Sequence, residues 1–241
     1  MENPVITLSL PQLALAFIPV AITLLILFRW SFGTGNALYA LGRMLVQLLL
    51  IGYVLAWIFG AHSGLLILLV LAIMLVASSW IAMGTVKEHR WPLLGASLIS
   101  ITVGGGLTLA LITQVVLQME PWYLPRYMIP LAGMVFANAM TAVSLAAERL
   151  YAELGHGLDW NEARLTAYRA AMIPVINALF AVGLVSLPGM MTGQILSGVS
   201  PLTAARYQII VMCMIFASAG ISTAIFLALG RKRVDQSPRS G

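Results

Sequence analysis

Residues 64–83 read GLLILLVLAIMLVASSWIAM, twenty residues without a charged side chain. A helix needs about 20 predominantly apolar residues to cross the hydrocarbon core of a bilayer, so this stretch predicts a membrane-spanning helix. The rest of the chain is similar: 61% of its 241 residues are hydrophobic, 9% are charged, and the mean hydropathy is +0.97. Soluble domains carry about 25% charged residues, so the composition excludes a water-soluble protein.

Outward from this stretch, charged residues and clusters of Pro and Gly divide the chain into seven predicted spans. They cover residues 6–28, 37–59, 64–83, 92–118, 129–147, 174–196 and 207–229. Seven spans with short loops leave no room for a second soluble domain. We therefore expect an all-α integral membrane protein with a single polytopic domain over residues 1–241.

The lysines and arginines predict the orientation. If the C-terminus is cytoplasmic, ten of them lie in cytoplasmic segments and only Arg126 and Arg206 lie in outer ones. Such an excess is typical of the cytoplasmic side, and seven spans then place the N-terminus outside. The first segment agrees, because it carries Glu2 but no Lys or Arg. We therefore attribute the net charge of +5 to basic residues that set the orientation of the protein in the membrane, and we expect no nucleic-acid partner.

One cytoplasmic segment is longer than a turn. Residues 146–173 connect the fifth and sixth predicted spans and have a helical composition. Gly155 and Gly157 indicate a helix end, and Asp159 begins a capping box that predicts a second helix from Trp160. We expect a helix, a bend and a second helix on the cytoplasmic side.

The second of these helices is predicted to be amphipathic. Glu162, Thr166 and Arg169 recur at helical spacing and form a polar stripe beside an apolar one. Such a helix could bind a partner protein, or it could lie among the lipid headgroups, and the residues alone leave both open. If it binds a partner, the candidate contact residues are Trp160, Glu162 and Arg169.

Charged side chains are scarce inside the predicted spans. Arg43 lies inside the second span, with Gln47 one turn later on the same face, and a structural role, with Glu148 as a possible partner, is the favoured interpretation. No Asp or Glu lies well inside a span. Carriers driven by protons or sodium generally need such a carboxylate, so that class becomes less favoured.

Neutral polar and thioether side chains are the candidates for a translocation path. They are Asn138 and Thr141 on the fifth span and Met190, Met191 and Gln194 on the sixth. Such groups could line a path, but they could also make interhelical hydrogen bonds and apolar packing contacts. Both interpretations stay open.

Two stretches could act as hinges. In the sixth span Pro188 removes a helical hydrogen bond, and Gly189 forms a GxxxG pair with Gly193, so we expect a kinked, closely packed segment. Three consecutive glycines, residues 104–106, weaken the fourth span. Tight packing alone would also explain both stretches.

Motifs for nucleotide binding and catalysis are absent from the sequence. No GxxxxGK[ST] motif occurs, and no grouping of Ser, His and Asp or pair of carboxylates suggests an enzyme. The single cysteine, Cys213, and three scattered histidines indicate no disulfide and no structural zinc site, and a metal site is left unassigned. We expect no bound cofactor.

Several motifs resemble one known family. They are Gly42-Arg43 with Gln47-Leu48, residues 52–55 (GYVL), 138–140 (NAM), 174–177 (PVIN) and above all 187–196 (LPGMMTGQIL). In these motifs the chain resembles the FetB-type ABC permease family, which includes bacterial iron-export permeases and plant aluminium-tolerance relatives. The resemblance covers about residues 10–230. The resemblance implies a multi-pass permease of the bacterial inner membrane, a homodimer that pairs with a separate ABC ATPase and exports a metal such as iron. ATP would bind that ATPase subunit.

The chain departs from the family pattern in its cytoplasmic segment, which is shorter than usual and contains Asp159, Trp160 and Asn161. The spans also lack the carboxylate or histidine cluster that iron would favour. Two other classes therefore remain as alternatives, an ATP-independent secondary carrier of a small polar solute and a membrane scaffold protein. ATP-dependent flux would separate the permease from both.

Overall fold

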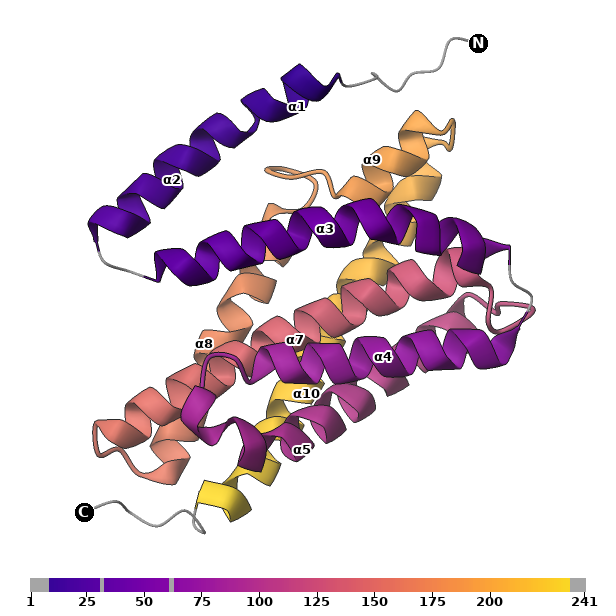
Figure 1. Cartoon of the computed structure of the whole chain (residues 1–241). Helices are drawn as coiled ribbons and strands as arrows, with labels where there is room; N and C mark the ends of the chain where they lie inside the picture. Colours follow the sequence, from indigo (N-terminus) through magenta and orange to yellow (C-terminus); the bar gives the residue numbers. More distant parts are fainter. Residues whose placement is uncertain (1–8, 31–32, 61–62, 235–241) are drawn as a thin grey trace. The chain divides into compact units, whose positions relative to one another are not determined.

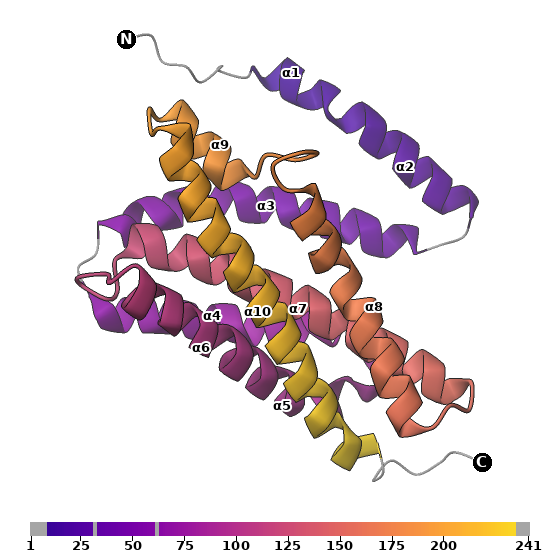
Figure 2. The same cartoon turned by 180° about the vertical axis from the view of Figure 1, so that it is seen from behind.

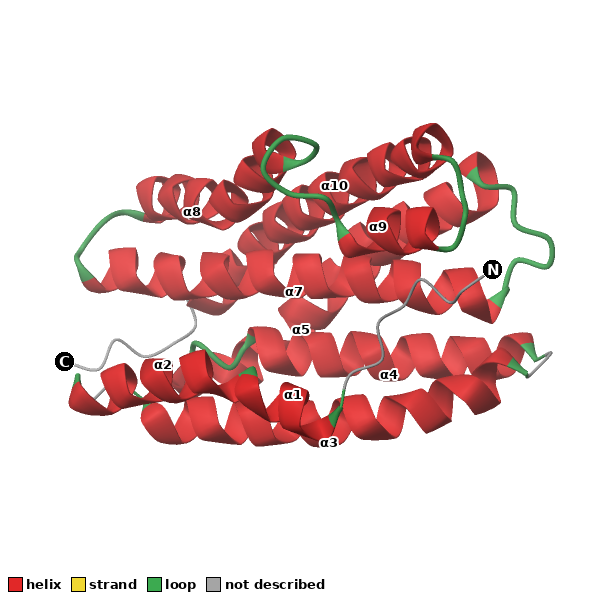
Figure 3. Cartoon of the chain, turned by 90° about the horizontal axis from the view of Figure 1, so that it is seen from above, coloured by secondary structure: helices red, strands yellow, loops and turns green. Residues whose placement is uncertain are grey.

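The computed structural model describes residues 9–30, 33–60 and 63–234, and the part of the chain that it describes is helical apart from loops and one β-bridge between Val182 and Ser186 (Figure 3). The predicted all-α class is confirmed. The chain divides into two compact units, residues 1–61 and 62–241. Residues 1–8, which include Glu2, and residues 235–241 lie outside the described ranges, so the predictions on the terminal segments rest partly on residues without a structural account.

The first unit contains α1 (Leu10–Leu15), α2 (Phe17–Arg29) and α3 (Thr34–Phe59) (Figure 1). A capping box starts α1, in which the Ser9 backbone N–H donates to Gln12 Oε1 at 2.8 Å. Gly33 precedes α3 with a φ of 52°, a left-handed conformation that glycine adopts without strain, and this lets the chain reverse so that α3 packs on α2.

The second unit is a bundle of longer helices. In chain order its elements are α4 (Gly64–Ala82), η1 (Lys87–His89), α5 (Arg90–Ile101), η2 (Thr102–Gly106), α6 (Leu107–Ala110), η3 (Leu111–Val116), α7 (Pro125–Gly155), α8 (Trp160–Ala181), α9 (Gly189–Leu196) and α10 (Pro201–Val234). The π-helical stretches η2 and η3 continue α5 and α6, so residues 90–116 form one long helical rod. Helix α10 packs against α5, α7, α8 and α9 (Figure 2).

Six helical stretches of the described chain are long and apolar enough to cross a membrane, one fewer than the seven predicted. They are Leu10–Arg29, Thr34–Phe59, Gly64–Ala82, Lys87–Val116, Pro125–Gly155 and Pro201–Arg231. The predicted span at 174–196 is not among them, because it is not a single helix. It comprises the second half of α8, a non-helical segment at residues 182–188, and α9.

Local backbone chemistry explains this break. Gly183 has a φ of 83°, and its N–H donates to the carbonyl oxygen of Ser186 instead of continuing the helix. Pro188 then stands in an extended conformation as the N-cap of α9. The predicted kink at Pro188 is thus replaced by a complete interruption between two helices.

Two of the three central glycines, Gly104 and Gly105, lie at a close contact of three helices. A Cβ on Gly104 would lie 2.6 Å from the backbone nitrogen of Ser222 on α10, and one on Gly105 would lie 3.1 Å from Val135 on α7. Small residues allow helix backbones to approach closely in membranes. The structure therefore assigns packing to Gly104 and Gly105, with a π-helical distortion over Thr102–Gly106.

Candidate functional site

Charged side chains collect at one end of the second unit, here named the charged end. It comprises the α4–α5 connection with the first residue of α5 (residues 83–90), the end of α7 with the α7–α8 turn and the start of α8 (residues 144–164), and α10 near Gly230 (Figure 1). Three contacts join these segments. The rings of His89 and Tyr151 stack with centroids 4.2 Å apart, Thr85 Oγ1 donates to the Ser144 carbonyl oxygen at 3.3 Å, and Trp160 reaches within 3.7 Å of a Cβ placed on Gly230.

The α7–α8 turn has the architecture that the sequence predicts. Helix α7 continues to Gly155, and Gly157 has a φ of 87° in the bend. Asp159 accepts a hydrogen bond from the Glu162 backbone N–H at 2.8 Å and caps α8, which begins at Trp160. The predicted helix, bend and second helix are confirmed, and both helices continue without interruption from this end into the bundle.

The three predicted partner-contact residues occupy different environments on α8. Trp160 is half-buried beside α10, whereas Glu162 and Arg169 are exposed. On the same exposed face the residues change after Arg169 to apolar ones, with Ile173 56% and Phe180 77% exposed. The face therefore changes from polar to apolar along α8, as expected for a helix that passes from water into lipid.

Sequence reasoning missed a buried carboxylate at the charged end. Glu153 is 8% exposed and pairs with Arg149 one turn earlier on α7. A buried carboxylate generally needs such a partner. The i, i+4 spacing of the two residues was the available signal.

The opposite end of the second unit, here named the far end, has fewer charges. Gly64 contacts Trp122 and Tyr123 there, and Tyr207 shares a cavity of about 240 Å³ with residues 117–120. Helix α8 runs from the charged end toward the far end, since Trp160 lies beside Gly230 whereas Val182 lines a pocket with Gln208. Helix α8 therefore extends from one end of the bundle to the other, although the first half of the helix carries charged side chains.

That pocket lies where the segment after α8 meets α9 and α10. Its volume is about 240 Å³, and Met191 of the predicted path residues lines it together with Gln208 and Met212 of α10. Met190 and Gln194 are half-buried on the same short helix, α9. Gln208 was not selected from the sequence, because only the fold places it opposite α9.

The other two predicted path residues lie on α7 and bond within their own helix. Asn138 Nδ2 donates to the Met134 carbonyl oxygen at 2.8 Å, and Thr141 Oγ1 donates to the Ala137 carbonyl oxygen at 2.9 Å. Asn138 is half-buried and Thr141 is exposed. Both hydrogen bonds lie within α7 and reach no other helix.

The predicted hinge residues flank the break before α9. Pro188 is the N-cap and Gly189 is the first residue of the helix. A Cβ on Gly189 or Gly193 would meet no described atom within 4 Å, so the close packing predicted for this GxxxG pair is not present within the described chain.

Arg43 and Gln47 lie in the first unit, one turn apart on α3, and both are exposed. Glu148, the suggested partner of Arg43, belongs to the second unit. The pairing stays a prediction.

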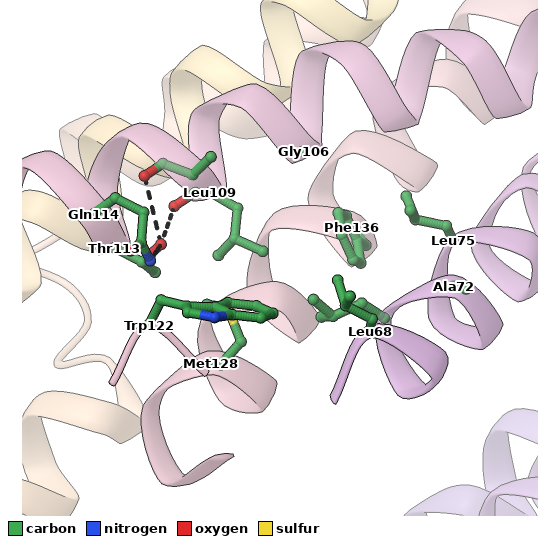
Figure 4. A pocket seen from close by; sticks show the side chains of 12 residues that line it. Leu68, Ala72, Leu75, Gly106, Leu109, Thr113, Gln114, Trp122, Met128 and Phe136 are labelled. Atoms are coloured by element: carbon green, nitrogen blue, oxygen red, sulfur yellow. Dashed lines mark hydrogen bonds between the residues drawn. The ribbon is translucent and has the colours of Figure 1, made fainter. Parts of the chain in front are cut away.

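A larger pocket of about 540 Å³ lies between α4, the 107–116 stretch and α7 (Figure 4). Its lining is mostly apolar, with Leu68, Trp122 and Phe136 around the opening shown. The polar pair in its lining is hydrogen-bonded, since Gln114 Nε2 donates to Thr113 Oγ1 at 3.0 Å and Thr113 Oγ1 donates to the Leu109 carbonyl oxygen at 2.9 Å. None of the predicted path residues lines this pocket.

A metal centre of the common kind is not found: among the described residues no three His, Cys, Asp or Glu side chains lie close enough to hold an ion together.

Comparison with known proteins adds the family. The model of the uncharacterised protein family UPF0014 matches residues 10–234. The chain is 37% identical to a UPF0014 membrane protein of Synechocystis over 79% of each chain. It is 34% identical to the "Probable iron export permease protein FetB" of Escherichia coli, over 89% of this chain and 87% of that one.

A plant relative is similar at the same level. The UPF0014 membrane protein STAR2 of rice is 34% identical over 89% of this chain and 79% of its own length. No solved structure matches significantly. The resemblance inferred from motifs such as LPGMMTGQIL (187–196) is confirmed over nearly the whole length, and this multi-pass membrane protein belongs to the UPF0014 family.

Proposed function

We propose that this chain is the permease subunit of an ABC transporter, working with a separate ATPase subunit to export a metal cation such as iron. Its similarity to a protein named as a probable iron export permease supports the transport class. The sequence has no GxxxxGK[ST] motif, so ATP would be bound and hydrolysed by the partner chain.

The charged end is the observation that carries this proposal. An ATPase that drives transport must transmit its conformational changes to the membrane-spanning helices, and rigid helices that extend from the docking surface can transmit them. Helices α7 and α8 begin their traverse at this end, and the His89–Tyr151 stack ties the α4–α5 connection to α7. A partner bound here would therefore pull on α4, α5, α7 and α8 together.

The charged end would face the cytoplasm. It carries Lys87, Arg90, Arg149 and Arg164, whereas Arg126 and Arg206 lie toward the far end. This distribution follows the excess of basic residues on the cytoplasmic side. With α8 and the segment after it as one traverse, the chain would cross seven times, with its N-terminus outside and its C-terminus inside.

A homodimer would cover the exposed break after α8. Leu184 and Val185 are 91% and 85% exposed on a non-helical segment. Non-helical backbone at membrane depth is tolerated only where protein covers it or where it lines a water-filled cavity. A second copy packed on this segment and on the apolar face of α8 would meet that requirement, in the bacterial inner membrane.

The test is transport by the reconstituted pair. The chain and its ATPase are placed in inside-out vesicles, and uptake of Fe(II) is followed with and without ATP. We expect uptake that requires ATP and is lost when the Walker lysine of the ATPase is replaced. Uptake driven by an ion gradient without the ATPase would indicate a secondary carrier instead, and no uptake of any cation would indicate a scaffold.

A further inference from the structure

Three side chains meet where α4 ends and α5 begins, and they are here named the Arg90 cluster: Trp80, Arg90 and Trp91. The guanidinium carbon of Arg90 lies over the Trp80 ring, 4.3 Å from its centroid, and the Trp91 ring contacts the Trp80 ring edge to face with centroids 5.4 Å apart. Arg90 Nε also donates to the Met83 carbonyl oxygen at 3.4 Å. The guanidinium is therefore held in one place, and this bond uses one N–H group of a side chain that can donate several.

The positive charge of Arg90 is not paired with a carboxylate. Within the described ranges the only ion pair joins Arg149 to Glu153 on α7. Lys87 and Glu88, the neighbouring charges of the α4–α5 connection, are both exposed and opposite in sign, so they largely offset each other. The Arg90 cluster therefore presents one fixed positive charge beside two aromatic rings.

The cluster lies at the end of two apolar faces that the second unit leaves uncovered. Trp80 continues a row of exposed side chains on α4, and Trp91 begins another on the rod of residues 90–116, while α4 packs against α5. The rows include Leu69, Ile73 and Val76 on α4 and Ile99, Val103 and Leu107 on the rod. Tryptophan is enriched where membrane spans meet the lipid headgroups, so we place the cluster at headgroup level and these faces beside the acyl chains.

A phospholipid with a net negative charge fits both parts of this surface. A guanidinium binds phosphate through short, charge-assisted hydrogen bonds. Basic pockets between membrane-spanning helices bind anionic headgroups, and the cytoplasmic leaflet, which the charged end would face, carries a negative surface potential. The acyl chains would cover the apolar faces of α4 and the rod, which a soluble anion would leave uncovered.

We infer that the Arg90 cluster binds the phosphate group of an anionic phospholipid. Arg90 supplies the charge and the hydrogen bonds, and Trp80 is a positioning residue that holds the guanidinium through its ring face. Because His89, the preceding residue, stacks on Tyr151, a lipid bound here would also restrict the α4–α5 connection. The inference requires a membrane around the second unit but neither an ATPase nor a transported cation, so it goes beyond the proposed function.

The test measures lipid binding to the full chain purified in detergent. Native mass spectrometry compares phosphatidylglycerol with phosphatidylcholine of the same acyl chains. We expect phosphatidylglycerol to bind at least about fivefold more tightly, the scale of one basic residue near an anionic surface. Arg90→Gln should remove most of this preference because it removes the charge. Trp80→Leu should lower the preference as well, because the guanidinium loses its aromatic support.

Arg164→Gln is the matched control, because it removes an exposed positive charge from the same end of the second unit. It should leave the preference for phosphatidylglycerol unchanged. Thermal unfolding without added lipid checks that the variants are folded. If Arg90→Gln does not fold, Arg90→Lys keeps a cation at the same position without the planar guanidinium, and it should bind phosphatidylglycerol more weakly than the wild type does.

A photoreactive benzophenone amino acid in place of Val76 identifies what covers the apolar face. Val76 is 58% exposed and lies one helical turn before Trp80. In membranes we expect adducts with phospholipid. Cross-links instead to residues 1–61, to a second copy or to an ATPase would show that protein covers this face, and they would overturn the inference.

Three results of the binding experiment would also overturn it. The first is an unchanged preference in both Arg90→Gln and Trp80→Leu, and the second is an equal loss in Arg164→Gln, which would indicate a diffuse charge effect. The third is stabilisation by inorganic phosphate alone that depends on Arg90 and equals that by phosphatidylglycerol, which would indicate a site for a soluble anion. ATP-dependent Fe(II) uptake is measured separately, so the failure of this site and the failure of the proposed function are distinguishable.

Discussion

The imidazole of His89 stacks on the phenol ring of Tyr151, with centroids 4.2 Å apart and planes inclined by 28°. The two residues are far apart in sequence, one in the α4–α5 connection and the other near the end of α7. This stack holds the α4–α5 connection against the end of α7, so a partner protein that binds the charged end would contact both at once.

Replacing Tyr151 with Leu should separate these two parts. Aromatic pairs contribute about 0.5–1.5 kcal/mol beyond their buried area, so we expect the free energy of unfolding to fall by about 1 kcal/mol. Co-purification of the ATPase should weaken as well, because the α4–α5 connection loses its fixed position. Tyr151→Phe keeps the ring and serves as the control. Equal ATPase recovery for both variants would show that the stack has no role in docking.

The contact of Gly104 with α10 predicts a strong packing effect. A Cβ there would lie 2.6 Å from the Ser222 nitrogen, and backbone cannot move aside cheaply. Gly104→Ala should lower the free energy of unfolding by about 1–3 kcal/mol, as overpacking does. Gly106, two residues later, has no described atom within 4 Å of its would-be Cβ, so Gly106→Ala should be neutral or stabilising. Thermal unfolding in detergent compares the two, and similar melting temperatures would contradict the assigned helix contact.

How far the sequence could predict the structure depends on the range of the interactions involved. The start of α8 at Trp160 was predictable, because an N-cap acts over three residues and Asp159 carries the necessary carboxylate. Most of the spans were predictable for a similar reason, since twenty apolar residues suffice to identify one.

The break after α8 was harder to predict. Residues 174–196 are apolar on both sides of the interruption, so hydropathy does not separate the end of α8 from α9. Gly183 and Pro188 are compatible with a kinked helix or with a full stop, and the fold decides between them. The pocket lined by Met191 and Gln208 was not predictable, because these two residues line one cavity only when α9 packs against α10.

The exposed charges of α8 give a test of docking. Charge reversal at Glu162 or Arg169, or Trp160→Ala, should weaken co-purification with the ATPase and leave membrane insertion intact, because the first two side chains are exposed. Arg126→Glu, toward the far end, is the matched control and should have no effect. If all three variants bind normally, docking lies elsewhere, and residues 87–90 are the next segment to test.

Topology can be tested with reporters fused to the C-terminus and to the α7–α8 turn. The basic residues of the charged end predict that both reporters are active only in the cytoplasm. A reporter inserted after Val199, in the connection between α9 and α10, should be active only outside, because α8 and α10 traverse the bundle in opposite directions. Cytoplasmic activity of all three fusions would exclude α8 as a crossing.

The last prediction concerns Asn138 and Met190, two of the four path candidates that do not line the pocket of Met191 and Gln208. Asn138 bonds only to a carbonyl group of its own helix, at 2.8 Å, so Asn138→Ala removes no interhelical hydrogen bond that the structure shows. We expect its free energy of unfolding to change by less than about 1 kcal/mol, and that of Met190→Leu to change as little.

If these side chains line the path, both variants should nevertheless lower ATP-dependent flux per folded protein several-fold, because the cation loses an amide oxygen or a thioether on its way. Met74→Leu on α4 is the control, since Met74 contacts Gly133 and belongs to no predicted path. Uptake into inside-out vesicles, normalised to folded protein by size-exclusion chromatography, measures the effect. Wild-type flux in both variants would leave packing as the role of Asn138 and Met190, and would exclude both residues from the path.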